Sequence, residues 1–249
     1  MTGMTAEIGY AKAVREDLVA AHRRQWQRLG RAGTWWNGAE RVAIAREVRR
    51  AWDCALCKER KAALSPYAVP GEHAPVAELG AAAVDVVHRV TTDPGRLSRV
   101  MYDRALAAGL DAEHYVELIG VVATVVSIDS FCRGISVALH PLPDPAPGQP
   151  SRYRPSAARM ERAWVPLVPD GYAREPEADL FDDGPGHHTG NVIRALSLVP
   201  DEVRGVKDLL AAHYVPMQRF MDMTFHRSLS RAQMELVASR VSALRSCFY

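Results

Sequence analysis

Apolar and polar residues recur at helical spacing along most of the chain, and no run of alternating positions is typical of a strand. The pattern begins near residue 11, and prolines, glycines and the pair Asn37-Gly38 interrupt it at intervals. The expected helices cover about residues 11–29, 39–61, 75–90, 97–108, 112–139, 191–198, 201–220 and 230–246. The pattern therefore predicts an all-α fold.

Two stretches differ from the others in composition. The expected helix over 112–139 is largely apolar, which indicates a central buried helix. Residues 141–155 contain six prolines, and the stretch over 166–190 is loop-like. We therefore expect a proline-rich linker and loop over 141–190.

A weak internal repeat relates the two ends of the chain. The segment Glu16–His22 parallels Lys207–His213, and a cysteine follows each histidine after a similar interval, 32 residues in one copy and 34 in the other. A repeat of this kind predicts two related helical units packed about a pseudo-twofold axis. The expected division is a first unit over 1–140, the linker and loop, and a second, partial unit over 191–249.

Composition narrows the class of protein. The chain has 249 residues, 48% of them hydrophobic and 24% charged, with a net charge of +2, which gives no attraction to nucleic acid. The longest apolar run, around residues 121–126, is too short for a membrane span, and residues 1–7 lack the apolar core of a signal peptide. We therefore expect a cytoplasmic protein whose four cysteines start reduced.

The pair Cys54 and Cys57 forms a C-x-x-C motif, which in a chain without a secretory signal indicates a redox centre. An inert buried pair is one alternative. A zinc site is another, but it needs four ligands, and the remaining cysteines are isolated in the sequence. We therefore expect no metal and no organic cofactor.

The end of the chain carries a second pattern, in which Glu235 lies twelve residues before Cys247. This segment and the C-x-x-C region resemble the AhpD-like alkylhydroperoxidase and carboxymuconolactone decarboxylase family, in particular its peroxidase-related branch. The family motif is a glutamate, a C-x-x-C pair twelve residues later and a histidine four residues after the second cysteine. The resemblance implies an AhpD-like helical fold, and it extends to residues 78–139, which look like the helical half that follows the motif.

Both copies of the motif are incomplete. In the first copy Val42 stands where the family has glutamate, and Lys61 stands where it has histidine. In the second copy the sequence stops at Tyr249, where the second thiol would follow. The resemblance would place a cysteine or selenocysteine after Tyr249, and either a truncated sequence or a UGA codon read as a stop would explain why the sequence ends before it.

The resemblance also implies a chemistry. Cys57 would attack a hydroperoxide, Cys54 would resolve the sulfenic acid to a disulfide, and a thioredoxin-like or lipoyl partner would restore the thiols. The family further implies a homo-oligomer. On one continuous helix Arg49 and Arg50 would lie near Cys54 and favour its thiolate.

Proton transfer requires a base, and the first motif lacks the usual one. Glu47 lies two helical turns before Cys54, and Glu40 lies fourteen residues before it, so either carboxylate could serve, although solvent-exposed charges are the simpler interpretation. His88 lies in an otherwise apolar helix, where it is either a relay or a hydrogen-bonded core residue. The candidate catalytic set is Cys54, Cys57, Glu40, Glu47, His88, Glu235 and Cys247.

Three functions remain open from the sequence. The leading one is a thiol-dependent peroxidase that reduces hydroperoxides and has no nucleic-acid or membrane partner. The second is a helical scaffold or regulatory protein whose motifs have lost their chemistry. The third is a thiol-independent enzyme of the decarboxylase kind, which would use general acid–base residues.

Overall fold

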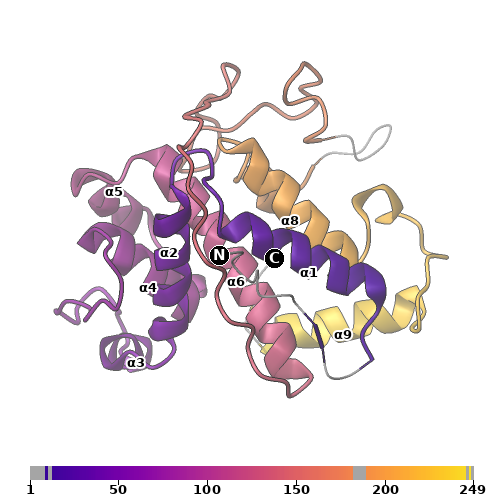
Figure 1. Ribbon diagram of the computed structural model, residues 1–249, viewed down its shortest axis with the longest axis horizontal. Helices are drawn as coiled ribbons and strands as arrows, with labels where there is room; N and C mark the ends of the chain where they lie inside the picture. Colours follow the sequence, from indigo (N-terminus) through magenta and orange to yellow (C-terminus); the bar gives the residue numbers. More distant parts are fainter. Residues whose placement is uncertain (1–8, 11–12, 182–188, 245–246, 248–249) are drawn as a thin grey trace.

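Helices form nearly all of the regular structure in the computed structural model, which describes residues 9–10, 13–181, 189–244 and 247 (Figure 1). These residues include no strand, although two isolated β-bridges occur. The all-α prediction is confirmed. The helices are α1 (Glu16–Leu29), α2 (Gly38–Ala51), α3 (Ala55–Ala62), α4 (Ala81–Thr92), α5 (Arg99–Ala107), α6 (Ala112–Gly134), α7 (Asn191–Arg194), α8 (Pro200–His213) and α9 (Arg231–Leu244), with 3-10 turns η1 (Pro94–Arg96) and η2 (Met217–Arg219).

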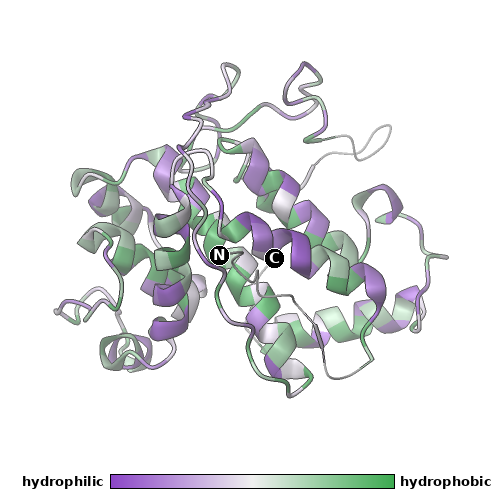
Figure 2. Ribbon diagram, viewed as in Figure 1, coloured by the Kyte–Doolittle hydropathy of each residue, from purple (hydrophilic) through white to green (hydrophobic). Residues whose placement is uncertain are grey.

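The long apolar helix α6 forms the centre of the fold, as its composition predicted. It packs against α2 and α4 on one side and α8 on the other (Figure 1). Figure 2 shows its apolar colouring running through the middle of the molecule. Leu118, Val121, Val125 and Ile128 are completely buried, and each such side chain contributes about 1.5–3 kcal/mol relative to an exposed one. By length and composition α6 could cross a membrane, but 67% of its most apolar window is buried inside the fold, which makes it a core helix.

The expected continuous helix over residues 39–61 is wrong, because the chain breaks between α2 and α3. Trp52 and Asp53 leave the helix, and Cys54 has the extended backbone of an N-cap, with φ −67° and ψ 121°. These residue types have modest helix propensity, and the guanidinium of Arg133 on α6 stacks over the Trp52 ring at 5.6 Å. Cys54 therefore does not share a helix face with the residues of α2.

The proline-rich segment is an extended strap rather than a free linker. The backbone N–H of Ala146 donates to the carbonyl of Gly30 at 2.7 Å, and the Trp26 indole donates to the carbonyl of Pro141 at 2.8 Å. A side chain at Gly30 would begin 2.8 Å from a backbone oxygen of the strap, so this close approach requires glycine. The strap thus follows the turn between α1 and α2.

The repeated segments meet each other in space. Helices α1 and α8 pack side by side, and Nε2 of His22 lies 2.7 Å from Nε2 of His213, its equivalent in the repeat (Figure 1). Burial lowers the pKa of His22 to about 3 and also lowers the pKa of His213, so both imidazoles are neutral. One hydrophobic core includes residues from both expected units. The unit boundaries at residues 140 and 190 stay a prediction.

A buried ionic cluster joins four helices and the turn before α2. Arg41 of α2 bonds to Glu117 of α6 and, at 3.0 Å, to Glu202 of α8; these three side chains are 0–2% exposed. Arg28 of α1 also pairs with Glu202, at 2.6 Å. Glu117 accepts the backbone N–H of Trp35 as well. The cluster therefore fixes how α1, α2, α6 and α8 meet.

The charges in this cluster depend on one another. Burial alone would lower the pKa of Arg41, but the carboxylates of Glu202 and Glu117 outweigh it and raise that pKa. Burial is also the largest influence on Glu117 and raises its pKa, although Arg41 acts in the opposite direction. Removing one partner leaves a buried charge with incomplete compensation.

We expect Arg41→Met to lower the free energy of unfolding by about 3–5 kcal/mol, because the variant keeps the bulk and leaves two buried carboxylates without their shared cation. Urea unfolding followed by circular dichroism measures the change. Arg99→Met is the matched control, since Arg99 pairs with Asp103 where both side chains are about half exposed (53% and 51%), and it should cost less than about 1 kcal/mol. Equal losses in the two variants would contradict the assignment.

Candidate functional site

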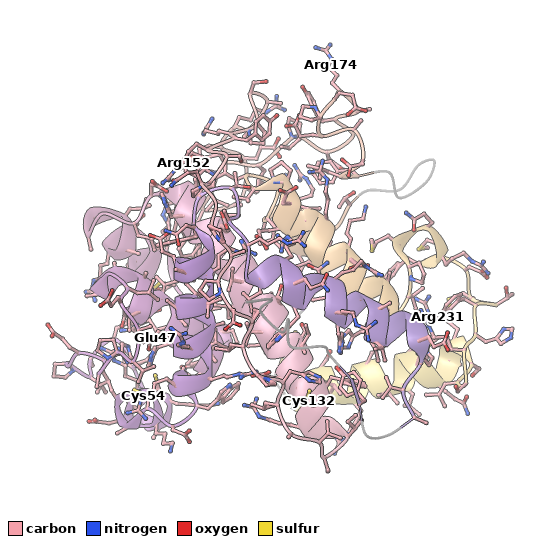
Figure 3. All side chains as sticks on the ribbon, in the orientation of Figure 1. Glu47, Cys54, Cys132, Arg152, Arg174 and Arg231 are labelled. Atoms are coloured by element: carbon pink, nitrogen blue, oxygen red, sulfur yellow. The ribbon has the colours of Figure 1, made fainter. Side chains whose placement is uncertain are left out.

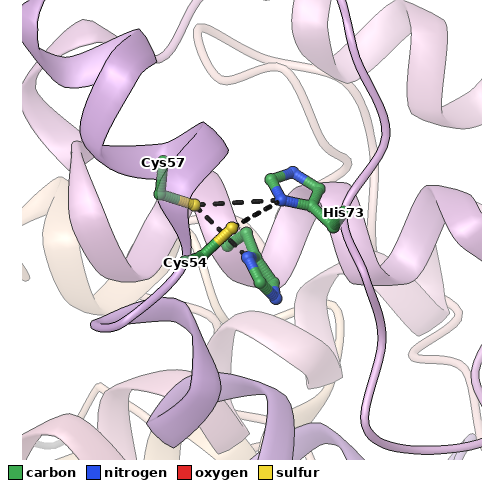
Figure 4. Close-up of side chains that lie close together, drawn as sticks. Cys54, Cys57 and His73 are labelled. Carbon is green, nitrogen blue, oxygen red and sulfur yellow. Dashed lines mark hydrogen bonds between the residues drawn. The ribbon is translucent and has the colours of Figure 1, made fainter.

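Four side chains converge where α3 meets α4: Cys54, Cys57, His73 and His88. Their sulfur and nitrogen atoms all lie within 4.8 Å of one another. Cys54 is the N-cap of α3, Cys57 lies in its first turn, and His88 lies on α4. His73 comes from the loop between these helices, and Figure 4 shows its ring facing both sulfur atoms. Both cysteines are free thiols and are buried.

Each sulfur has an imidazole nitrogen within contact distance. Cys54 Sγ lies 3.4 Å from His73 Nδ1, and Cys57 Sγ lies 3.3 Å from His88 Nδ1 (Figure 4). Cys57 Sγ is also 3.9 Å from His73 Nδ1. The two imidazole rings lie against each other with their centroids 4.1 Å apart. The site is thus a compact set of two thiols and two imidazoles.

A carboxylate faces the far nitrogen of each imidazole. His88 Nε2 lies 3.1 Å from Glu47 Oε2, and His73 Nε2 lies 3.1 Å from Asp85 Oδ1. A carboxylate accepts hydrogen bonds, so each Nε2 carries a hydrogen and donates it. The Nδ1 atom of each ring therefore faces a sulfur.

Glu47 also holds the loop that carries His73. Its Oε1 accepts the backbone N–H groups of Val76 at 2.6 Å and Ala77 at 2.8 Å, while its Oε2 faces His88. Glu47 is completely buried, as is His88. A single carboxylate of α2 therefore positions both the loop and the α4 histidine.

Asp85 and Arg60 hold the loop from its other side. Arg60 of α3 donates to Asp85 at 2.8 Å and to the carbonyls of Val69 and Gly71. Asp85 also accepts from Arg89 at 2.7 Å. Gly71 has φ +132°, a backbone conformation that favours glycine, at the point where the loop turns toward the thiols.

The environments of the thiol and imidazole groups differ in their effect on pKa. Burial alone would raise the pKa of Cys54, but hydrogen bonds from His73 and Cys57 outweigh it and lower that pKa. For His73, burial is outweighed by Asp85 and the two sulfurs, which raise its pKa to about 10. Burial lowers the pKa of His88, against the opposing influence of Glu47. The arrangement favours a thiolate beside a charged His73 and a neutral His88.

A small cavity reaches one of the two sulfurs. It has a volume of about 20 Å³, and its lining includes Cys57, Arg60, Tyr67, His73 and Arg96. A space of this size holds a water molecule or a reactant of similar size. Cys57 therefore borders a path for a small reactant.

The structure brings together four of the seven candidate residues, namely Cys54, Cys57, Glu47 and His88. Figure 3 shows Glu47 and Cys54 on the same side of the molecule. Glu40 lies elsewhere and forms a capping box with Asn37 at the start of α2. Its carboxylate therefore stabilises a helix end.

The remaining two candidates, Glu235 and Cys247, lie on α9 and just beyond it. Helix α9 is at the opposite end of the molecule from α3 (Figure 1). Glu235 bonds to Tyr214 and, at 2.6 Å, to Arg231, and Cys247 is exposed. Tyr249 lies outside the described residues, so the expectation of a further thiol there stays a prediction.

The expected contribution of Arg49 and Arg50 to the Cys54 thiolate is wrong. It required one continuous helix, and the break after Ala51 turns Cys54 away from α2. Arg49 instead forms two hydrogen bonds of 2.8 Å with Asp129 on α6. The positive group beside the thiols is His73, and Arg60 lies behind it, against His73 Nε2.

The sequence interpretation missed His73, Asp85 and Arg60. The sequence did contain one indication of a metal site. His73 follows Cys57 after fifteen intervening residues, and His88 follows His73 after fourteen more. The argument against a metal site counted only cysteines as ligands. Including histidines would have given the four ligands that such a site needs.

Comparison of the chain with protein-family models, with curated proteins and with solved structures finds no match in any of the three. The functional interpretation therefore depends on the geometry of the thiol and histidine site.

We expect Glu47→Gln to loosen the loop that carries His73, because an amide cannot replace a carboxylate that accepts three hydrogen bonds. The variant should lose about 1–3 kcal/mol of stability, and the backbone amides of Val76 and Ala77 should exchange faster with deuterium. Glu78→Gln in the same loop is exposed and should leave both measurements unchanged. Unchanged protection of Val76 and Ala77 in Glu47→Gln would contradict the role of Glu47.

Proposed function

We propose that the protein is a thiol-dependent peroxidase in which Cys54 and Cys57 cycle between dithiol and disulfide. One observation carries the proposal: each sulfur contacts its own imidazole, and each imidazole is backed by a carboxylate. A thiol beside a base that a third group orients is the usual arrangement of an activated sulfur nucleophile. An inert buried pair of cysteines would not need an imidazole and a carboxylate beside each sulfur.

Cys57 is the residue that attacks. It borders the cavity, and its contact with His88 continues to Glu47, both of which are completely buried. The family resemblance assigns the attack to the second cysteine as well. Cys54 then resolves the oxidised sulfur, since its own sulfur shares the His73 ring with Cys57.

The reaction has two steps. The Cys57 thiolate bonds to one peroxide oxygen, the O–O bond breaks, and the departing alkoxide or hydroxide takes a proton from an imidazole, which leaves a sulfenic acid on Cys57. The Cys54 thiolate then attacks the Cys57 sulfur, the S–O bond breaks, and the departing hydroxide takes the proton that Cys54 gave to His73 and leaves as water. The peroxide gains two electrons, and the two sulfurs together lose two. A thioredoxin-like or lipoyl dithiol restores them by exchange and becomes a disulfide itself.

The proposal extends to the fold family, the assembly and the cellular location of the protein. The fold is an AhpD-like arrangement of two related helical units, the protein assembles as a homo-oligomer, and it acts in the cytoplasm. The contact between the repeated segments, through His22 and His213, supports the two-unit arrangement. The small cavity beside Cys57 favours hydrogen peroxide or a small alkyl hydroperoxide as the substrate.

We expect the metal-free, reduced protein to lose two thiols for each peroxide consumed and to form a disulfide between Cys54 and Cys57. Peptide mass spectrometry locates the bridge. Cys57→Ser should abolish rapid peroxide consumption, whereas Cys54→Ser should stop at a sulfenic acid that a dimedone probe labels. His88→Gln should slow consumption by about 100-fold, because it removes the proton relay.

Cys247→Ser is the matched control, because it removes an exposed thiol that is not part of the thiol and histidine site and should leave the rate unchanged. A wild-type protein whose Cys54 and Cys57 stay unlinked after peroxide treatment would overturn the proposal in favour of a scaffold. Catalytic turnover of any other substrate that survives in the Cys54→Ser, Cys57→Ser double variant would favour a thiol-independent enzyme instead.

A further inference from the structure

The two thiols and two imidazoles described above also form the donor set of a metal centre. We propose that the reduced protein binds one Zn²⁺ through Cys54 Sγ, Cys57 Sγ, His73 Nδ1 and His88 Nδ1. This inference uses the residues of the proposed peroxidase site, but it does not require that the peroxidase proposal be right.

The spacing of the donor atoms fits a tetrahedral ion. Zinc lies about 2.3 Å from sulfur and about 2.0–2.1 Å from imidazole nitrogen, so a tetrahedral site separates sulfur from nitrogen by about 3.5 Å. Three of the four sulfur–nitrogen distances in the structure are 3.3, 3.4 and 3.9 Å, and all four atoms lie within 4.8 Å of one another. The donors therefore surround a point that one ion can occupy with only small side-chain shifts.

The chemistry of the donors selects the metal. Two thiolates and two imidazoles are the ligands of structural zinc sites, whereas Mg²⁺ and Ca²⁺ prefer oxygen. All four positions come from the protein, so the site is closed. Zinc here would stabilise the join between α3, the loop and α4, since those three segments supply the ligands.

The groups behind the ligands also fit zinc. Histidine ligands usually donate their second ring N–H to a carboxylate, which fixes the ring and strengthens the metal bond. Glu47 accepts from His88, and Asp85 accepts from His73, each at 3.1 Å. Both rings therefore already present Nδ1 toward the sulfurs.

The charges of the filled site balance. Zn²⁺ and the guanidinium groups of Arg60 and Arg89 carry four positive charges, and two thiolates with Glu47 and Asp85 carry four negative ones. The two imidazoles bind as neutral ligands. A buried site of this kind avoids the large cost of an uncompensated charge.

The metal and the disulfide exclude each other. A disulfide uses the electron pairs with which both sulfurs would bind zinc, so only the dithiol form holds the ion. Bound zinc would in turn keep both sulfurs from attacking a peroxide. If both proposals are right, peroxide oxidation of the two sulfurs releases the ion.

The test uses the full-length protein, reduced, stripped of metal with a chelator and kept without oxygen. Titration with Zn²⁺ against a chromophoric chelator should show one ion per chain. Titration with Co²⁺ as a spectroscopic probe should give thiolate-to-cobalt charge-transfer bands and the intense visible bands of a tetrahedral ion. Both signals should persist in Cys247→Ser and in His114→Ala, which removes a histidine outside the site.

Variants separate ligands from supporting groups. Cys54→Ser and Cys57→Ser should each weaken the thiolate-to-cobalt bands, whereas His73→Ala, which keeps both sulfurs, should retain these bands and bind Co²⁺ more weakly than Asp85→Asn. Asp85→Asn should keep the spectrum and bind about 10–100-fold more weakly, because Asp85 acts through His73. Circular dichroism before the titration shows whether each variant is folded, and the wild-type cobalt spectrum reports the ligand types without any variant.

Two results would overturn the zinc site: no saturable binding by the wild-type protein, or a cobalt spectrum without thiolate bands. Failure of the peroxidase proposal looks different. If the protein binds one zinc ion but forms no disulfide with peroxide after metal removal, the zinc site stands and the peroxidase proposal fails. If the metal-free protein reduces peroxide but never binds zinc, the peroxidase proposal stands and the zinc site fails.

Discussion

Arg41 lies at the centre of the molecule with its guanidinium shared by Glu117 and Glu202, which come from two other helices. The attraction between these groups has to offset their removal from water, and it does so only when α2, α6 and α8 meet in one arrangement. Burial of apolar side chains along α6 supplies most of the free energy of folding, but apolar contacts alone would allow the helices to shift relative to one another. The ionic cluster restricts these shifts. It sets the position of α2, and α2 carries Glu47, on which the thiol and histidine site depends.

The geometry of the site therefore depends on residues that are far apart in the sequence. Glu47 holds the loop through two backbone N–H groups and orients His88 on α4, while Arg60 and Asp85 fix the loop from the opposite side. Cys54 and Cys57 join this set only because the chain breaks after α2 and restarts as α3. The same geometry suits a sulfur nucleophile and a tetrahedral metal ion, since both need deprotonated sulfur beside an imidazole. Both would therefore require the reduced pair, and a disulfide between the two sulfurs would exclude both.

Local pattern was sufficient to predict the helical class and the central position of α6, and to select the C-x-x-C pair as a candidate, because periodicity and residue type are local properties. The break at Trp52 was missed because the helical pattern continues across it, and the Arg133 guanidinium that stacks over Trp52 comes from far along the chain. His73 was missed because the loop that carries it has no periodicity, and Glu47 fixes its path from another helix. Glu47 itself was selected on the assumption of a shared face with Cys54, and it reaches the site instead through His88. The sequence thus indicated which residue types could take part in chemistry, but it did not indicate which side chains each of them would contact.

The contact between His22 and His213 places one hydrogen between two equivalent residues. Because both rings are neutral, one Nε2 carries the shared hydrogen and donates it to the other Nε2, which accepts it. The accepting ring then holds its own hydrogen on Nδ1. The two copies of the repeat therefore contain the same side chain in different tautomers, and a strictly symmetric pair is impossible at this position. The two similar segments have the same residue at this position, and the shared hydrogen gives the two side chains unequal roles.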